Sequence, residues 1–241
     1  MPPSPRQAPP AYPGTVTDSH WVRWHDSYAD PSSSLSRRLL RVQHRVAQAL
    51  DDRVDGDIVV LSLCAGDGRD LLEPLSRHPR RLDVRAVLVE LDPSNAERAR
   101  RTVAAERLER VAVRQADAAV PAHYRDVAPV DLLLACGIFS NISDDDVRRT
   151  VAALPPLLRS PTADRRGGQV LWTRHRRDPD LTPRIRGWFA ECGFREIGFD
   201  TEPGYQYAVG CHQLEADHPT EPDYPTGPLF TFLGDGASAL S

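Results

Sequence analysis

Hydrophobic residues in this chain fall into short unbroken runs that alternate with longer amphipathic stretches. The clearest run covers residues 58–63 and is rich in β-branched side chains, which predicts a strand buried on both faces. Further strands are predicted on the same grounds at 84–91, 111–115, 130–136, 168–173, 195–200 and 205–212. The last two flank a turn at Pro203-Gly204.

Amphipathic stretches separate most of these runs. Residues 36–50 place apolar side chains at helical spacing, which predicts a helix with one buried face and an arginine-rich face in solvent. Further helices are predicted to begin at Asp70, Ser94, Ser143 and Thr182. Ser143 is the expected N-cap of a helix whose first turn is acidic, and Thr182 is the expected cap before Pro183.

The order of these elements predicts an α/β fold. Strands that alternate with helices at this spacing form a parallel sheet covered by helices on both faces, which gives three layers. The two consecutive closing strands break the alternation, so we expect an antiparallel hairpin at one edge of a seven-stranded, mostly parallel sheet.

The length of 241 residues favours one such domain with tails. Residues 1–19 are polar and rich in proline, and we expect them to be disordered. The domain is expected to cover 20–214, with 20–50 as an N-terminal cap or lid and first helix. Residues 215–241 form a C-terminal tail, in which the apolar segment 229–233 is expected to dock on the domain.

The aromatic stretch 21–30 has two interpretations. It is a structural cap on the domain, or it is a lid over a ligand pocket with His25 or Tyr28 facing the substrate.

Composition narrows the possible partners. The net charge of −4 gives no reason to expect nucleic acid. All 30 basic residues are arginine, which suggests a GC-rich bacterial gene and means that arginine clusters carry little information. No apolar run approaches the ~18 residues of a membrane span, and the N-terminus lacks a signal-peptide pattern.

The four cysteines, Cys64, Cys136, Cys192 and Cys211, form no C-x-x-C pair and have no histidine at metal-ligand spacing. We therefore expect no metal site. Reduced, buried thiols are expected, as in a cytoplasmic protein.

A small-residue turn, Cys64-Ala65-Gly66-Asp67-Gly68, follows the first strand and precedes a helix. Glycines there let the backbone approach a ligand, and a helix N-terminus offers unpaired N–H groups, so the turn predicts a nucleotide-type cofactor site. Leu71 stands where a dinucleotide fingerprint has its third glycine, and no lysine follows, which excludes a Walker-type phosphate loop.

Acidic residues at later strand ends fit the same site. Glu90 lies 22 residues after Gly68, at the end of the second strand. A carboxylate there can accept hydrogen bonds from both ribose hydroxyls. Asp117, after the third strand, can accept from an adenine amino group.

The segments LSLCAGDGRD (61–70), VLVELDPSNAERAR (87–100), VRQADA (113–118) and DLLLACGIFSNIS (131–143) resemble class I S-adenosylmethionine-dependent methyltransferases. The resemblance covers about Ser36 to Leu214 and implies a three-layer Rossmann-like fold. It departs from the family at Ser62 and Cys64, where the pattern has an acidic residue and its first glycine. The implied cofactor contacts are Ala65, Gly66 and Gly68 for the methionine part, Glu90 for the ribose, Asp117 and Ala118 for adenine, and Leu91 and Cys136 beside them. Asp92 is the alternative ribose ligand, since the family also shows Asp-Pro at this strand end.

Methyl transfer depends mainly on positioning, so no catalytic triad is required. Candidate acceptor-side residues are His175, Asn141, His25, Tyr28, Arg174 and Trp172. His175 is the best-placed general base. The alternative is that it is only a polar residue at the end of a strand. Arg174, with Arg176 and Arg177, is either a site for an anionic acceptor or part of a solvated loop.

The sequence therefore predicts an enzyme that transfers a methyl group from S-adenosylmethionine to a small-molecule acceptor. The alternatives are an aminopropyl transferase of the same fold, an inactive homologue that only binds the ligand, and a nicotinamide oxidoreductase, which Leu71 disfavours. No nucleic-acid or membrane partner is expected, and the oligomeric state is left open between a monomer and a homodimer.

Overall fold

The computed structural model describes residues 30, 32–53, 56–216 and 226–233. The chain forms two compact units, Met1–Arg37 and Arg38–Ser241. In the described part of the first unit, Ser32 donates its N–H and hydroxyl to Asp30 Oδ1 at 2.8 and 2.7 Å. The expectations for the tail 1–19, for the aromatic stretch and for His25 and Tyr28 lie outside the described residues.

The second unit contains the α/β domain. Its strands are β1 (Ile58–Leu63), β2 (Val84–Glu90), β3 (Val111–Gln115), β4 (Leu132–Ala135), β5 (Gln169–His175), β6 (Phe194–Thr201) and β7 (Tyr207–Leu214). The α-helices are α2 (Ser34–Asp51), which begins in the first unit, α3 (Arg69–Arg77), α4 (Pro93–Ala105), α5 (Asp144–Ala152) and α6 (Thr182–Glu191). The short 3₁₀ helices are η1 (Pro121–His123), η2 (Arg125–Val127) and η3 (Pro155–Leu157).

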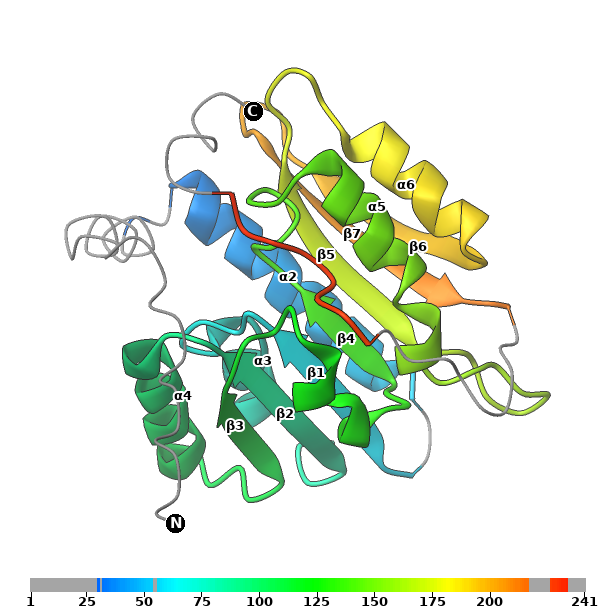
Figure 1. The fold of residues 1–241 in the computed structure, drawn as a ribbon. Helices are drawn as coiled ribbons and strands as arrows, with labels where there is room; N and C mark the ends of the chain where they lie inside the picture. The colour runs from blue at the N-terminus through cyan, green and yellow to red at the C-terminus, as the bar shows by residue number, and fades with distance from the viewer. Residues whose placement is uncertain (1–29, 31, 54–55, 217–225, 234–241) are drawn as a thin grey trace, which may run out of the picture. The chain divides into compact units, whose positions relative to one another are not determined.

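All seven strands form one sheet in the order β3-β2-β1-β4-β5-β7-β6 (Figure 1). Neighbouring strands from β3 to β5 pair in parallel, and β7 pairs antiparallel with both β5 and β6. This confirms the predicted mostly parallel sheet with an antiparallel hairpin at one edge. Gly204, in the turn between β6 and β7, has a φ of +83°, which glycine adopts without strain.

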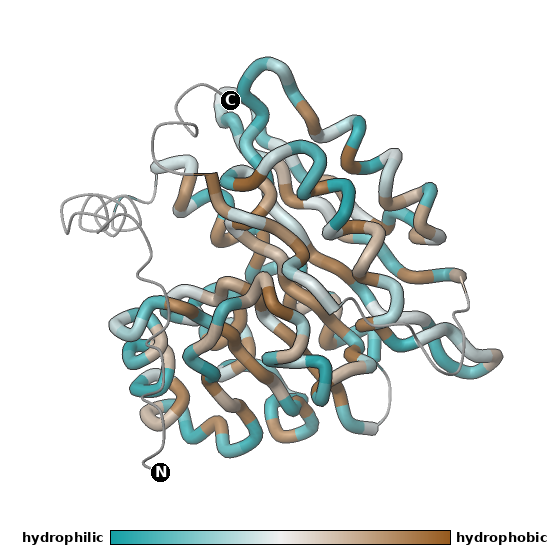
Figure 2. Tube along the Cα trace, viewed as in Figure 1, coloured by the Kyte–Doolittle hydropathy of each residue, from teal (hydrophilic) through white to brown (hydrophobic). Residues whose placement is uncertain are grey.

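Two hydrophobic clusters cover the two faces of the sheet, with helices α2, α3 and α4 over one and α5 and α6 over the other. Every residue of β1 is buried, as expected for a central strand that has helices on both faces. Hydrophobic residues follow the central strands, and polar residues dominate the helix surfaces and loops (Figure 2). The resulting three layers leave the carboxyl ends of the parallel strands at one edge of the sheet.

Several sequence-based details were wrong. Helix α4 starts at Pro93, because the Asp92 carboxylate caps it by accepting the Asn95 N–H at 2.7 Å. Thr182 lies inside α6, and the Asp180 carboxylate accepts its N–H at 2.9 Å. The expected solvated face of α2 includes Arg45, which instead forms a two-bond ion pair with Asp200 on β6.

The segment 229–233 lies on the face of the sheet that carries α5. Leu229 and Phe230 are buried, and Phe232 forms an antiparallel bridge with Ile142. The Leu229 N–H donates to the Ala119 carbonyl at 2.8 Å. This segment therefore covers the loops that follow β3 and β4.

Candidate functional site

The turn after β1 is wound through left-handed backbone. Cys64, Gly66 and Gly68 have φ of +51°, +58° and +80°. A Cβ placed on Gly66 would meet no atom within 4 Å, so the backbone there faces open space. A Cβ on Gly68 would lie 2.6 Å from Leu72 Cδ1 and 2.8 Å from Leu88 Cδ2, so Gly68 is required for packing of α3. The two glycines therefore serve different purposes.

Glu90 closes this turn from the neighbouring strand. Its Oε2 accepts the Gly66 N–H and its Oε1 accepts the Asp92 N–H, both at 2.8 Å. The side chain is 8% exposed, and burial raises the pKa of Glu90, while bonds from the backbone of Asp92, Gly66 and Leu91 oppose that rise. A carboxylate has about four acceptor positions, so it can still accept from a ligand hydroxyl. Asp92 is instead occupied as the N-cap of α4.

The end of β3 supplies the next group. Asp117 Oδ1 accepts the Ala119 N–H at 2.8 Å, so the side chain caps its own turn. Its other oxygen accepts no hydrogen bond among the described residues. Ala118 is buried, with its carbonyl accepting the Tyr124 hydroxyl at 3.1 Å. Leu91, at the end of β2, is 56% exposed and offers an apolar surface beside these groups.

The end of β4 lies across the sheet from Glu90. Gly137 has a φ of +75° and, like Gly66, would place a Cβ in open space. Its N–H donates to Thr173 Oγ1 at 2.9 Å, and its carbonyl accepts the side-chain N–H of Asn141 at 2.7 Å. Asn141 therefore shapes this loop, and its own carbonyl accepts the Leu233 N–H at 2.8 Å.

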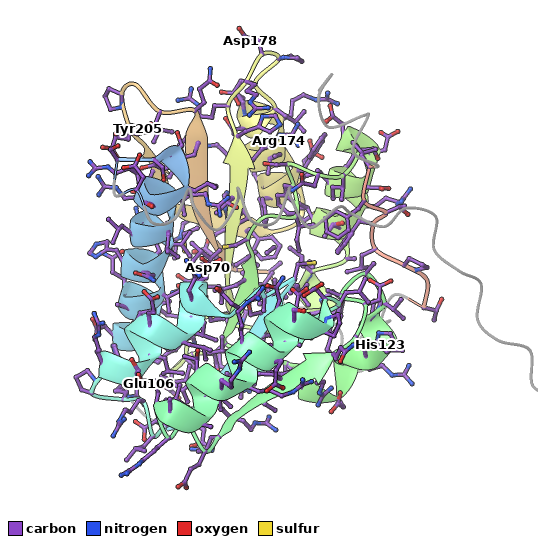
Figure 3. The ribbon with its side chains drawn as sticks, turned by 90° about the vertical axis from the view of Figure 1, so that its left-hand side faces the viewer. Asp70, Glu106, His123, Arg174, Asp178 and Tyr205 are labelled. Atoms are coloured by element: carbon purple, nitrogen blue, oxygen red, sulfur yellow. The ribbon has the colours of Figure 1, made fainter. Side chains whose placement is uncertain are left out.

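Cys136 is buried beside Asp70, a residue that the sequence reasoning treated only as the start of a helix. The Cys136 thiol and the Asp70 carboxyl are hydrogen-bonded, and burial raises the pKa of both groups. The positive charge of Arg38 opposes the rise at Asp70. Asp70 stands in the first turn of α3 (Figure 3), directly after the glycine turn. The sequence does not predict this contact, because Asp70 and Cys136 are far apart in the chain and meet only where α3 packs near the end of β4.

The end of β5 carries Arg174 and His175. Arg174 is buried, whereas His175 is half-buried and donates its backbone N–H to Ser140 Oγ at 2.9 Å. Burial, together with the charges of Arg174 and Arg177, lowers the pKa of His175, so its imidazole is neutral at neutral pH. Trp172, two residues earlier, is fully buried between Phe139 and Phe189 and donates its Nε1–H to His212. Its prediction as an acceptor contact was wrong.

The described residues fit a nucleoside cofactor. Gly66 and Gly137 face open space at the ends of β1 and β4, which lie side by side in the sheet. Glu90 and Asp117 present carboxylate oxygens at the ends of the next two strands. Ligands of open α/β sheets bind at this edge.

A separate cavity lies away from this edge of the sheet. About 1020 Å³ in volume, it opens between α2, the 161–167 loop and the amino end of β5, where charged side chains of both signs line it. Within the described part of the chain, no group of three or more His, Cys, Asp or Glu side chains is arranged to hold a metal ion. None of the described helices is both long and apolar enough to cross a membrane. The described cysteines are free thiols.

No protein-family model and no curated protein matches the chain by sequence. Solved structures do match its fold. Magnesium protoporphyrin IX methyltransferase from Synechocystis PCC 6803, crystallised with bound SAM, superposes with a TM-score of 0.59 at 12% identity, over 82% of this chain and 92% of that one.

Two further structures agree. An O-methyltransferase family protein from Burkholderia thailandensis matches with a TM-score of 0.57 at 18% identity, over 83% of this chain but only 62% of that one. Precorrin-6y C5,15-methyltransferase from Geobacter metallireducens GS-15 matches with a TM-score of 0.51 at 15% identity, over 73% of this chain and 88% of that one. With its strand order and its glycine turn, the chain has the fold of the class I S-adenosylmethionine-dependent methyltransferases.

Proposed function

We propose that the protein binds S-adenosylmethionine and transfers its methyl group to a small-molecule acceptor. The observation that carries this proposal is Glu90, whose two oxygens bind the backbone of the Gly66 turn and of Asp92. These bonds fix the carboxylate beside a glycine that faces open space. A carboxylate held there accepts hydrogen bonds from the two ribose hydroxyls of a nucleoside cofactor.

The remaining contacts follow the sheet edge. Ala65, Gly66 and Gly68 bring the backbone of the first turn close to the methionine part. Asp117 and Ala118 take the adenine, and the exposed Leu91 packs beside it. Cys136 and Gly137 complete the edge at β4. In this fold a relative is known with bound SAM, which supports the same ligand here.

Bound S-adenosylmethionine supplies an activated methyl group on a sulfonium. The chain then needs to hold the acceptor in line with that carbon and exclude water. We propose His175, neutral at the end of β5, as the group that accepts a proton from the acceptor. Asn141 orders the loop that borders this side of the site by donating to the Gly137 carbonyl.

Calorimetric titration with S-adenosylhomocysteine and with NAD tests the proposal. We expect binding of S-adenosylhomocysteine and none of NAD, since Leu71 replaces the third glycine of a dinucleotide site. Binding of NAD alone would overturn the proposal and favour an oxidoreductase.

A matched pair of variants tests the role of Glu90. Glu90→Gln should weaken S-adenosylhomocysteine binding by about tenfold or more, because charge-assisted bonds to the ribose are lost. Glu109→Gln, an exposed residue before β3, serves as the control and should bind like the wild type. An unchanged dissociation constant for Glu90→Gln would remove Glu90 from the site and point to Asp92.

A further inference from the structure

Arg174, at the carboxyl end of β5, is a buried cation whose ion pair with a carboxylate is long. Its side chain is 6% exposed, and its Nη1 donates to the Phe139 carbonyl. Its Nη2 forms an ion pair with Asp144 Oδ1 at 3.7 Å, which is beyond hydrogen-bond distance. Its buried Nε has no hydrogen-bond partner among the described residues. On the guanidinium edge formed by Nε and Nη2, one N–H group is therefore unsatisfied and the other has only this long contact.

Neighbouring charges do not balance this cation. The Asp144 carboxylate is shared, since its Oδ2 lies 3.6 Å from Nη1 of Arg184. Asp144 is also about half exposed, so water weakens both interactions. The nearby Asp180 is taken by Arg176, at 2.9 Å. Both of these carboxylates are thus engaged by other arginines.

The free edge has a specific chemical preference. The parallel N–H groups of Nε and Nη2 match the two oxygens of a carboxylate, which forms a planar pair of hydrogen bonds with them. A buried guanidinium that lacks such a partner keeps an uncompensated desolvation cost, which an incoming carboxylate relieves.

Arg174 lies at the carboxyl end of β5, next to the loop after β4, where we propose that the acceptor binds. Its strand pairs with β4 through Ala135 and Trp172, and the loop after β4 contacts β5 at two points. These are the Gly137 N–H on Thr173 Oγ1 and the His175 N–H on Ser140 Oγ. Figure 3 shows Arg174 beside β5 and Asp178 farther out in the loop that follows.

We propose that the methyl acceptor carries a carboxylate group, and that this group binds the Nε and Nη2 edge of Arg174. The inference rests on the proposed function, because it names the chemical class of the acceptor in the same site. Asp144 is the internal competitor for that edge.

The test uses the full chain saturated with S-adenosylhomocysteine. The ¹H–¹⁵N resonance of Arg174 Nε is followed by NMR during titration with acetate, with acetamide as the uncharged isostere and chloride holding the ionic strength constant. We expect a saturable shift with acetate and none with acetamide. No acetate response in a complex that binds S-adenosylhomocysteine overturns this inference and leaves the proposed function standing, whereas failure to bind S-adenosylhomocysteine overturns both.

Variants separate a binding role from a structural one. Arg174→Lys should lose about tenfold or more in acetate affinity, measured from other shifted resonances, because lysine lacks the planar fork. Asp144→Asn should bind acetate more tightly, since the competing carboxylate is gone. Arg110→Gln, at an exposed arginine before β3 that pairs with Asp57, is the matched control and should leave acetate binding unchanged.

Two further outcomes count against the inference. If Arg174→Lys binds acetate as the wild type does, Arg174 only anchors the Phe139 carbonyl. If inorganic phosphate shifts the Arg174 Nε resonance at concentrations as low as acetate does, the site recognises anions in general and not a carboxylate.

Discussion

Gly66 and Gly68 lie in one turn but have different surroundings. Gly66 faces open space, while Gly68 lies against Leu72 of α3 and Leu88 of β2. The first glycine thus leaves room beside the turn, and the second allows the helix to pack on the sheet. Cys64 shares their left-handed backbone, at a position where its Cβ costs about 1–2 kcal/mol.

Alanine at each position should separate these roles. Gly68→Ala should destabilise the protein by about 3 kcal/mol, because backbone strain adds to a collision with two leucines. Gly66→Ala should cost only about 1 kcal/mol of strain, yet weaken S-adenosylhomocysteine binding by about tenfold, because the methyl group enters the ligand space. Urea unfolding and calorimetry measure the two effects. Equal losses of stability would mean that Leu72 and Leu88 move aside.

Single residues of the candidate site differ in how far the sequence reveals them. Glu90 is visible because it ends an apolar run and follows the glycine turn at a fixed spacing. The partnership of Asp70 with Cys136 is invisible, since it joins residues that only the packing of α3 beside β4 brings together. Trp172 fails for the opposite reason, because a residue near a strand end is still buried when aromatic neighbours cover it.

At the scale of elements, the C-terminal segment 229–233 is held by backbone as much as by side chains. Thr150 Oγ1 donates to the Leu229 carbonyl at 3.2 Å, and the Thr231 N–H donates to Asp146 Oδ2 at 3.1 Å. The same Asp146 lies in the first turn of α5. The segment therefore links the helix after β4 to the loop after β3.

Two phenylalanines of this segment make a matched pair. Phe230 is 2% exposed and Phe232 is 47% exposed. Phe230→Ala should lower the free energy of unfolding by about 3 kcal/mol, since it leaves a cavity under the segment. Phe232→Ala should cost less than about 1 kcal/mol. Urea denaturation measures the free energy of unfolding of both variants. A loss for Phe230→Ala as small as that for Phe232→Ala would show that burial of Phe230 contributes little to stability.

Elements were predicted from the sequence more reliably than their ends. The unbroken run of β1 and the alternation of strands with helices define the sheet, because burial on both faces leaves a periodic signature. Two helix starts differ from the prediction because of aspartates before them: the Asp92 carboxylate caps α4, and the Asp180 carboxylate accepts the N–H of Thr182, which was expected to be the cap of α6. The order of β7 and β6 within the sheet also has no local signal, because it is set by pairing between distant strands.

At the scale of the whole molecule, His212 connects α6 to the sheet. Its ring stacks on Phe189 at 4.3 Å between centroids, and its Nδ1 accepts the Trp172 Nε1–H at 3.1 Å. The ring is 1% exposed, with Glu196 Oε2 3.6 Å from Nε2. Burial, against a smaller opposing effect of Glu196, lowers the pKa of His212 to about 4.

This depressed pKa makes stability fall in acid. The unfolded chain takes up the proton near pH 6.5, whereas the folded protein takes it up only near pH 4, so the free energy of unfolding declines between these values. The loss should reach about 3 kcal/mol. His212→Gln, which keeps an acceptor for Trp172, should remove this part of the pH dependence, while His44→Gln on the exposed side of α2 should not. Unfolding at a series of pH values tests it, and parallel curves for wild type and His212→Gln would contradict it.

The place of β7 between β5 and β6 has a consequence for synthesis on the ribosome. Among the described strands, β6 pairs only with β7, and β7 is made last. While the chain emerges, the five parallel strands β3, β2, β1, β4 and β5 can assemble in turn, but β6 must wait unpaired until β7 arrives to insert beside it. The backbone edge of β5 stays unpaired for that interval, so a nascent chain that ends before Tyr207 exposes a strand edge that the finished protein covers, and chaperones that bind extended segments would find it there.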